Sequence, residues 1–169
     1  VNIMKKRFTA FFISILCIGY SKAQSISIDV AAVRNKSQKV HGANLSVFYH
    51  FTENLNAGFE VNRFFEHRKT KETGEFLLSS WDYDFNVHYY LHPFKFLVVY
   101  PLTGFSVSVE KESSSVETIQ SKQLYFNSGG GLMLNTKTVK PHMEYIYANG
   151  NRKEHFLIAG ITIELELKK

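Results

Sequence analysis

Residues 81–91 read WDYDFNVHYYL and alternate between two kinds of side chain along the whole stretch. Odd positions carry Trp, Tyr, Phe, Val, Tyr and Leu, whereas even positions carry Asp, Asp, Asn, His and Tyr. Successive side chains of a β-strand leave opposite faces, so this period predicts a strand with one apolar and one polar face. A soluble sheet with an apolar core and a membrane barrel with a polar interior both contain such strands.

The rest of the chain contains further segments of the same kind and no convincing helical period. Eight segments have strand character: 25–33, 40–49, 55–65, 77–91, 96–110, 122–134, 139–148 and 155–167. The connections after the first, third, fifth and seventh segments are the longer and more polar ones: 34–39, 66–76, 111–121 and 149–154. This alternation predicts an all-β fold, an eight-stranded antiparallel up-and-down transmembrane β-barrel, with both termini at the short-turn, periplasmic end.

The apolar parity favours lipid as the surroundings of the barrel. It carries no charged residue across the central part of any segment, and the nearest charge is Arg63, beside the second long connection, where it could reach headgroups. A lysine or arginine at the bilayer midplane costs about 2–4 kcal/mol and little near the interface, so this distribution is the expected one. The outward set is predicted to include Ile28, Val30, Leu45, Val47, Phe59, Trp81, Phe85, Phe105, Val107, Leu124, Phe126, Met143, Ile161 and Ile163.

The opposite parity is polar and contains several glycines, which relieve crowding because eight strands leave room only for side chains. These polar residues predict a lumen network in which acids and bases satisfy one another. A cation site or a carboxylate–histidine pair for acid–base chemistry is the weaker interpretation. The predicted network contains Asp29, Glu60, Asp82, Asp84, His88, Lys140, His142 and Glu144. We expect no metal and no cofactor.

The first residues have the pattern of a signal peptide. Basic residues 5–7 precede an apolar run over 8–20, and Ser21-Lys22-Ala23 resembles a cleavage site. We therefore expect a signal peptide at 1–23 and one barrel domain at 24–169. Cleavage removes Cys17, the single cysteine, which excludes disulfides and thiolate metal sites in the mature chain. It also removes four bases and leaves 16 bases against 15 acids, a balance that does not favour nucleic-acid binding.

The signal ending in SKAQ, the eight amphipathic segments, and FNVHYYLHP followed by YPLTGFSVS together resemble a known family. They are similar to the small outer-membrane β-barrels of Gram-negative bacteria, the OmpA/OmpX-like porin superfamily. The resemblance implies an exported cell-envelope protein of the outer membrane, with a role in envelope integrity, adhesion or narrow solute passage. Many barrels of this family end in an aromatic residue, whereas this sequence ends in IELELKK.

The expected function is a structural or surface-interaction role for a monomeric barrel with a side-chain-filled lumen. A narrow porin-like channel is the alternative, followed by a lipid A-modifying enzyme or a soluble secreted barrel. Ser106, Ser108, His88 and His142 match no local motif of the enzyme families, so we do not expect an enzyme. Expected partners are outer-membrane lipid, lipopolysaccharide and, during insertion, the barrel-assembly machinery. A basic rim on the outer loops would face them: Arg34, Lys36, Arg68, Lys69, Lys71, Arg152 and Lys153.

Overall fold

The computed structural model describes residues 25–71, 74–114 and 117–167, so the expected signal peptide lies outside the described residues. The described ranges contain no helix long and apolar enough to cross a membrane. The strands are β1 (Ser25–Asn35), β2 (Val40–His50), β3 (Leu55–Lys71), β4 (Gly74–Tyr89), β5 (Leu91–Phe94), β6 (Leu97–Ser113), β7 (Thr118–Leu134), β8 (Val139–Asn149) and β9 (Lys153–Glu166).

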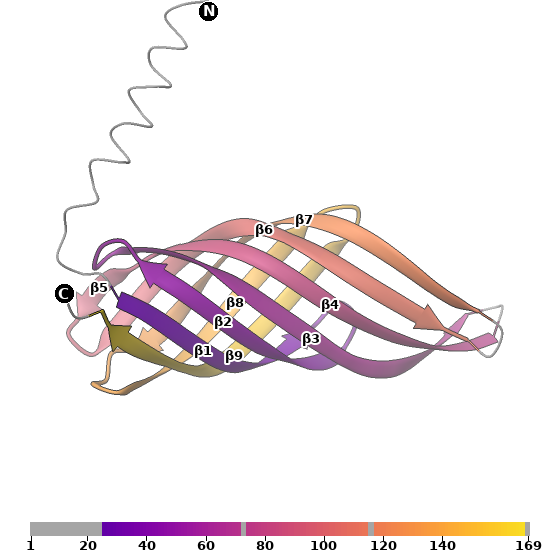
Figure 1. Ribbon diagram of the computed structural model, residues 1–169, viewed down its shortest axis with the longest axis horizontal. Coiled ribbons are helices and arrows are strands. Elements are labelled where there is room, and N and C mark those ends of the chain that lie inside the picture. The colour runs from indigo at the N-terminus through magenta and orange to yellow at the C-terminus, as the bar shows by residue number, and fades with distance from the viewer. Residues whose placement is uncertain (1–24, 72–73, 115–116, 168–169) are drawn as a thin grey trace, which may run out of the picture.

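All pairings between these strands are antiparallel, and the sheet closes on itself (Figure 1). The first strand, β1, pairs with both β2 and β9, and β4 pairs with both β3 and β6. The short β5 continues β4 after Tyr90 and pairs with the same neighbour, β6. The β4–β5 unit therefore counts as one strand of the cylinder, and the predicted closed, up-and-down, eight-stranded barrel is confirmed.

The interruption between β4 and β5 has a local cause. The N–H of Tyr90 donates a hydrogen bond to the carbonyl oxygen of Asn54 (2.6 Å), and Asn54 Nδ2 donates to the carbonyl oxygen of Tyr90 (2.7 Å). On the facing strand, Pro101 lies between Val99, which pairs with β5, and Leu102, which pairs with β4. Proline has no N–H to donate, so the break in the ladder is placed where Pro101 requires it.

Both ends of the described chain lie at one end of the barrel, because Ser25 pairs with Glu166. The turns 51–54, 95–96 and 135–138 lie at the same end, and the β3–β4 and β6–β7 hairpins extend at the other (Figure 1). The predicted long loops are wrong in part: most of 66–76 and 111–121 is strand, and the connection between β1 and β2 is only the turn 36–39. Hydrogen bonding between backbones extends these hairpins over residues that are mostly polar or charged, so the sequence pattern did not reveal them.

The two hairpins together rise beyond the rest of the cylinder. Pairing of β2 with β3 ends at Gly42 and Phe64, and pairing of β7 with β8 begins only at Phe126 and Asn149. Beyond these residues β3, β4, β6 and β7 remain paired with one another. The end of the barrel opposite Ser25 and Glu166 is therefore a four-stranded extension of one side of the barrel.

Burial alternates along the strands as the sequence predicted. In β2 every second residue is buried, and the residues between them are exposed or partly exposed. Large apolar side chains point outward in all parts of the cylinder: Phe59 is 69% exposed, Leu124 66% and Met143 61%. The same parity that the sequence assigns to lipid is thus the outer surface of the barrel.

Glycines on the inner parity leave room for the backbone and side chains of the neighbouring strand. We therefore expect Gly104→Ala to destabilise the barrel by about 1–3 kcal/mol. An added Cβ at Gly104 would lie 2.1 Å from the carbonyl oxygen of Phe85 and 2.1 Å from Asn86 Oδ1. Gly130→Ala is the matched control on the outer face, where the nearest atom is 3.0 Å away and the next 3.9 Å. Urea unfolding of both variants measures the difference, and equal stabilities would contradict the crowded interior.

Candidate functional site: the barrel interior and its two openings

Glu60 on β3 is the centre of a hydrogen-bond network inside the barrel. Asn86 Nδ2 on β4 donates to Glu60 Oε1 at 2.5 Å. From β2, Asn44 Nδ2 and the Ser46 hydroxyl donate to Glu60 Oε2 at 3.2 and 3.4 Å. All four side chains are buried. One carboxylate thereby joins three adjacent strands, and its four lone-pair positions suit several donors at once.

The network continues along the same strands. Asn44 Nδ2 also donates to Asn62 Oδ1 (2.9 Å), and Asn62 Nδ2 donates to Asp84 Oδ2 (2.8 Å). On the far side, Asn127 Nδ2 donates to Asn86 Oδ1 (3.3 Å). The amide side chains act as relays, because each carries both donors and an acceptor. Uncharged amides therefore connect Glu60 and Asp84 across three strands.

A second polar cluster lies nearer the end of the barrel where the described chain starts and finishes. Asp29 Oδ2 on β1 accepts a hydrogen bond from the Thr162 hydroxyl (2.8 Å) and lies 3.1 Å from His142 Nδ1. Tyr100 donates its hydroxyl proton to Glu144 Oε1 at 2.6 Å. These contacts involve β1, β6, β8 and β9, so with the Glu60 network every strand of the cylinder contributes to an interior polar cluster.

His88 and the two aspartates of β4 are less completely satisfied. The His88 ring packs against Phe48 (centroids 4.4 Å apart) and Tyr100 (5.1 Å), and its Nε2 has no hydrogen-bond partner. The Oδ1 atoms of Asp82 and Asp84 are also buried without a partner. Two cavities of about 10 Å³ each adjoin these groups, one lined by His88 and the other by both aspartates. A volume of about 10–15 Å³ holds roughly one water molecule, so single waters suit these atoms.

An apolar cluster that the sequence analysis did not identify shares the interior with these polar groups. Val33, Phe64, Ile146 and Ile158 are each at most 3% exposed, and the Phe64 ring lies 5.7 Å from that of Phe156. These residues occupy the inner parity of their strands, so they were recognisable by position. The interior is therefore part polar network and part packed hydrocarbon, and it is filled.

Arg152 closes the opening beneath the extended hairpins. It lies in the turn between β8 and β9 and forms an ion pair with Glu110, while its Nε lies 4.0 Å from Glu154 Oε1. Gln38 Nε2 donates to both carboxylates, at 3.3 and 3.2 Å. The hydrogen bond with Glu110 raises the pKa of Arg152 above its ordinary range. Arg152 was predicted as part of the outward rim, but its guanidinium points to the interior acids.

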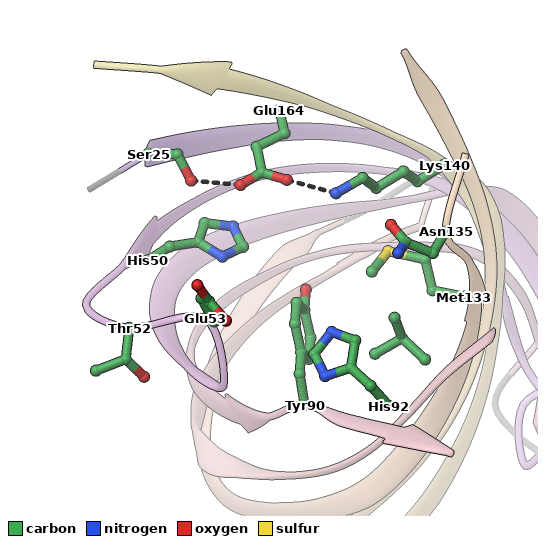
Figure 2. A pocket seen from close by; sticks show the side chains of 11 residues that line it. Ser25, His50, Thr52, Glu53, Tyr90, His92, Met133, Asn135, Lys140 and Glu164 are labelled. Atoms are coloured by element: carbon green, nitrogen blue, oxygen red, sulfur yellow. Dashed lines mark hydrogen bonds and ion pairs between the residues drawn. The ribbon is translucent and has the colours of Figure 1, made fainter. Parts of the chain in front are cut away.

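The other opening contains a pocket of about 230 Å³ (Figure 2). Glu164 bridges it, because it forms an ion pair with Lys140 and accepts a hydrogen bond from the Ser25 hydroxyl (2.5 Å). His50 and Tyr90 also line the pocket, and His50 Nε2 lies 2.9 Å from Ser27 Oγ. This ion pair and Arg152 place a cation at each end of an interior whose other charges are acidic.

The predicted network residues can now be located. Asp29, Glu60, Asp82, Asp84, His88, His142 and Glu144 are buried in the barrel, and Lys140 is partly buried at the opening. Glu110 and Glu154 are further buried acids, and no lysine or arginine whose side chain the structure describes is buried. Among the described residues no group of three or more His, Cys, Asp or Glu is placed to hold a metal ion.

The residues of the predicted basic rim differ in exposure and in their neighbours. Arg34, Lys36 and Lys153 are exposed, and Arg68 Nη1 lies 3.7 Å from Glu75 Oε2. Lys69 and Lys71 belong to β3, but their side chains lie outside the described part of the structure. The serines of the enzyme hypothesis are buried, and the Ser106 hydroxyl donates to Asn127 Oδ1 at 3.1 Å.

The sequence matches no protein-family model and none of the curated proteins. Solved structures match over nearly their whole length. Ail, the attachment invasion locus protein of Yersinia pestis, is 18% identical, with 86% of this chain and 99% of that chain covered and a TM-score of 0.62. The N-terminal barrel of Pseudomonas aeruginosa OprF is 16% identical (83% and 97% covered, TM-score 0.63).

OprG, an outer-membrane protein of Pseudomonas aeruginosa, is 10% identical, with 87% and 98% covered and a TM-score of 0.67. Sequence identities this low show a shared fold, and the role of one protein does not carry over to another. The closed eight-stranded cylinder, its apolar outer face and these matches agree with the resemblance that the sequence suggested. The chain has the fold of the small outer-membrane β-barrels.

Proposed function

We propose that the chain is an outer-membrane barrel whose apolar outer face contacts lipid. Support comes from the exposed side chains in the middle of the strands, such as Phe59, Phe105 and Ile161, which form a continuous apolar surface around the cylinder. A soluble monomer rarely exposes apolar patches of this extent. Closure also pairs each strand of the described cylinder with a neighbour on both sides, so no open sheet edge faces the bilayer.

Within the membrane, the barrel has a structural or surface-interaction role and no catalytic one. The observation that carries this proposal is the filled interior, in which Phe64, Ile146 and Ile158 pack together and the two central cavities hold about 10 Å³ each. A barrel of eight strands has an interior just wide enough for its own side chains. Solute passage would require these packed residues to move apart.

The four-stranded extension supports the surface-interaction part of the proposal. It places strand backbone and the polar residues of β3, β4, β6 and β7 beyond the apolar band. One structural match, Ail, is named for attachment and invasion, and another structure of Ail contains a heparin analogue. By analogy, the extension is the part of this protein that would contact an external surface or polymer.

Cell fractionation and gel mobility test the membrane assignment. We expect the protein in the outer-membrane fraction and expect unboiled samples to migrate differently from boiled ones, since the closed barrel resists unfolding by detergent. A protein that is fully soluble and migrates identically with and without boiling would overturn the proposal.

The closed interior predicts that the purified protein forms no stable single-channel steps in planar bilayers. A large general porin inserted into the same bilayers serves as the positive control for detection. Insertion is verified separately by protease protection and heat-dependent mobility of the same preparation. Reproducible steps from the inserted protein would favour the narrow-channel alternative over a structural role.

A further inference from the structure

Three neighbouring strands change in the same way at the outer end of the apolar band. On β1 the outward side chains from Ile28 to Ala32 are apolar, and Arg34 follows. On β2 the series from Val47 to Ala43 is apolar, and His41 follows. On β3, Ala57, Phe59 and Val61 precede Arg63. On each of the three strands, a basic residue thus follows an outward series of three apolar side chains.

The register brings these three bases together on one side of the barrel. Arg34 pairs directly with His41, and Arg63 pairs with Ala43, two positions from His41 along β2. Diagonal neighbours of this kind lie roughly 7–8 Å apart. We call Arg34, His41 and Arg63, with Trp81 beside them, the outer basic patch.

Trp81 positions the guanidinium of Arg63. The two residues pair across β3 and β4, the guanidinium carbon lies 5.0 Å from the centre of the Trp81 ring, and Nη1 donates to the carbonyl oxygen of Ser80 (3.4 Å). Stacking on an aromatic ring leaves the remaining N–H groups of an arginine free to bind an anion. Tryptophan also favours the level of lipid headgroups.

The patch differs from the other arginines in having no acidic partner. Arg68 is near Glu75 and Arg152 is paired with Glu110, whereas the described residues contain no ion pair for Arg34 or Arg63. Glu60 and Glu66 are each three residues from Arg63 along β3, but Glu60 is buried in the interior and Glu66 is exposed beyond the bulge after Phe64. The positive charge of the patch is therefore available to an anion from outside the protein.

We propose that the outer basic patch binds the phosphate groups of a lipid in the outer leaflet. The proposal rests on the membrane orientation given above, because that orientation puts the patch at the headgroup level. Arginine forks match phosphate oxygens, and His41 adds a further donor between them. A zwitterionic headgroup fits less well, since the patch offers no carboxylate for its cationic part.

Trp81 is the single tryptophan of the chain, so its fluorescence reports on the patch directly. The full chain is folded in nanodiscs of zwitterionic phospholipid and titrated with phosphorylated lipid A, with chemically dephosphorylated lipid A and with inorganic phosphate. We expect a saturable change with the phosphorylated lipid alone, weakened by added salt. An equal response to the dephosphorylated lipid, or the same response to inorganic phosphate, would overturn the assignment to a lipid phosphate.

Arg34→Gln tests the protein side without disturbing the Trp81 contact, and Lys137→Gln, in a turn at the opposite end, is the matched change of charge. We expect Arg34→Gln to weaken binding of phosphorylated lipid A about tenfold and Lys137→Gln to leave it unchanged. Equal affinities in the two variants would refute the patch. Heat-dependent mobility confirms that each variant is inserted, so failure of the patch is distinguishable from failure of the membrane assignment.

Discussion

Phe59→Lys is expected to destabilise the folded barrel in a phospholipid bilayer by about 2–4 kcal/mol. Phe59 lies in the middle of the apolar series of β3 and points outward with 69% exposure, and the centre of its ring lies 5.1 Å from that of Phe85. In a bilayer the new ammonium group would lie in hydrocarbon near the midplane. Urea titration of the lipid-embedded protein, followed by gel mobility, measures the change in the free energy of unfolding.

Phe65→Lys is the matched control, because it makes the same substitution on the same strand beyond Arg63. Phe65 is also exposed, and a lysine there reaches the headgroup region, so the expected cost is about 0–1 kcal/mol. Comparison of Phe59→Lys with Phe65→Lys shows whether lipid or water surrounds the barrel. If the barrel were soluble, both changes would replace an exposed apolar group by a charge in water, and each would stay within about 0.5 kcal/mol.

The outer face was predictable because lipid requires apolar side chains at alternate positions of every strand. The alternation that begins at Trp81 and recurs in all eight segments identified strands and faces without any knowledge of pairing. The extended hairpins were not predictable in this way. Residues such as Lys111 and Gln120 pair across β6 and β7 outside the apolar band, where neither face is apolar and the strand period disappears.

The interior was predictable only in composition. The inner parity identified Glu60 and Asp84 as interior residues, but which amides reach them depends on how far each strand is staggered against the next, and one sequence does not contain that stagger. The same limitation explains Arg152. Strand alternation does not assign a direction to the side chain of a turn residue. The ion pair of Arg152 with Glu110 therefore became evident only from the folded barrel.

Glu60→Ala is expected to destabilise the barrel by about 3 kcal/mol or more, which is the largest effect expected from an interior residue. The truncation leaves Asn86 Nδ2 without its acceptor and removes one acceptor each from Asn44 and Ser46. A buried donor left without a partner costs about 1–3 kcal/mol. The same urea titration measures the change, and a loss below about 1 kcal/mol would show that water or neighbouring groups replace the carboxylate.

Glu60→Gln removes the carboxylate at this position and keeps the size of the side chain. The amide keeps the shape of the side chain and one oxygen for Asn86, but its NH2 group replaces the oxygen that accepts from Asn44 Nδ2 and the Ser46 hydroxyl. The Ser46 oxygen can accept from this NH2 group, and the substitution removes a carboxylate that no lysine or arginine pairs with directly. Since removal of an unpaired buried charge recovers its desolvation penalty, we expect Glu60→Gln to retain most of the stability that Glu60→Ala loses. If the two variants were equally unstable, both acceptor oxygens of the carboxylate would be required by the donors Asn86, Asn44 and Ser46.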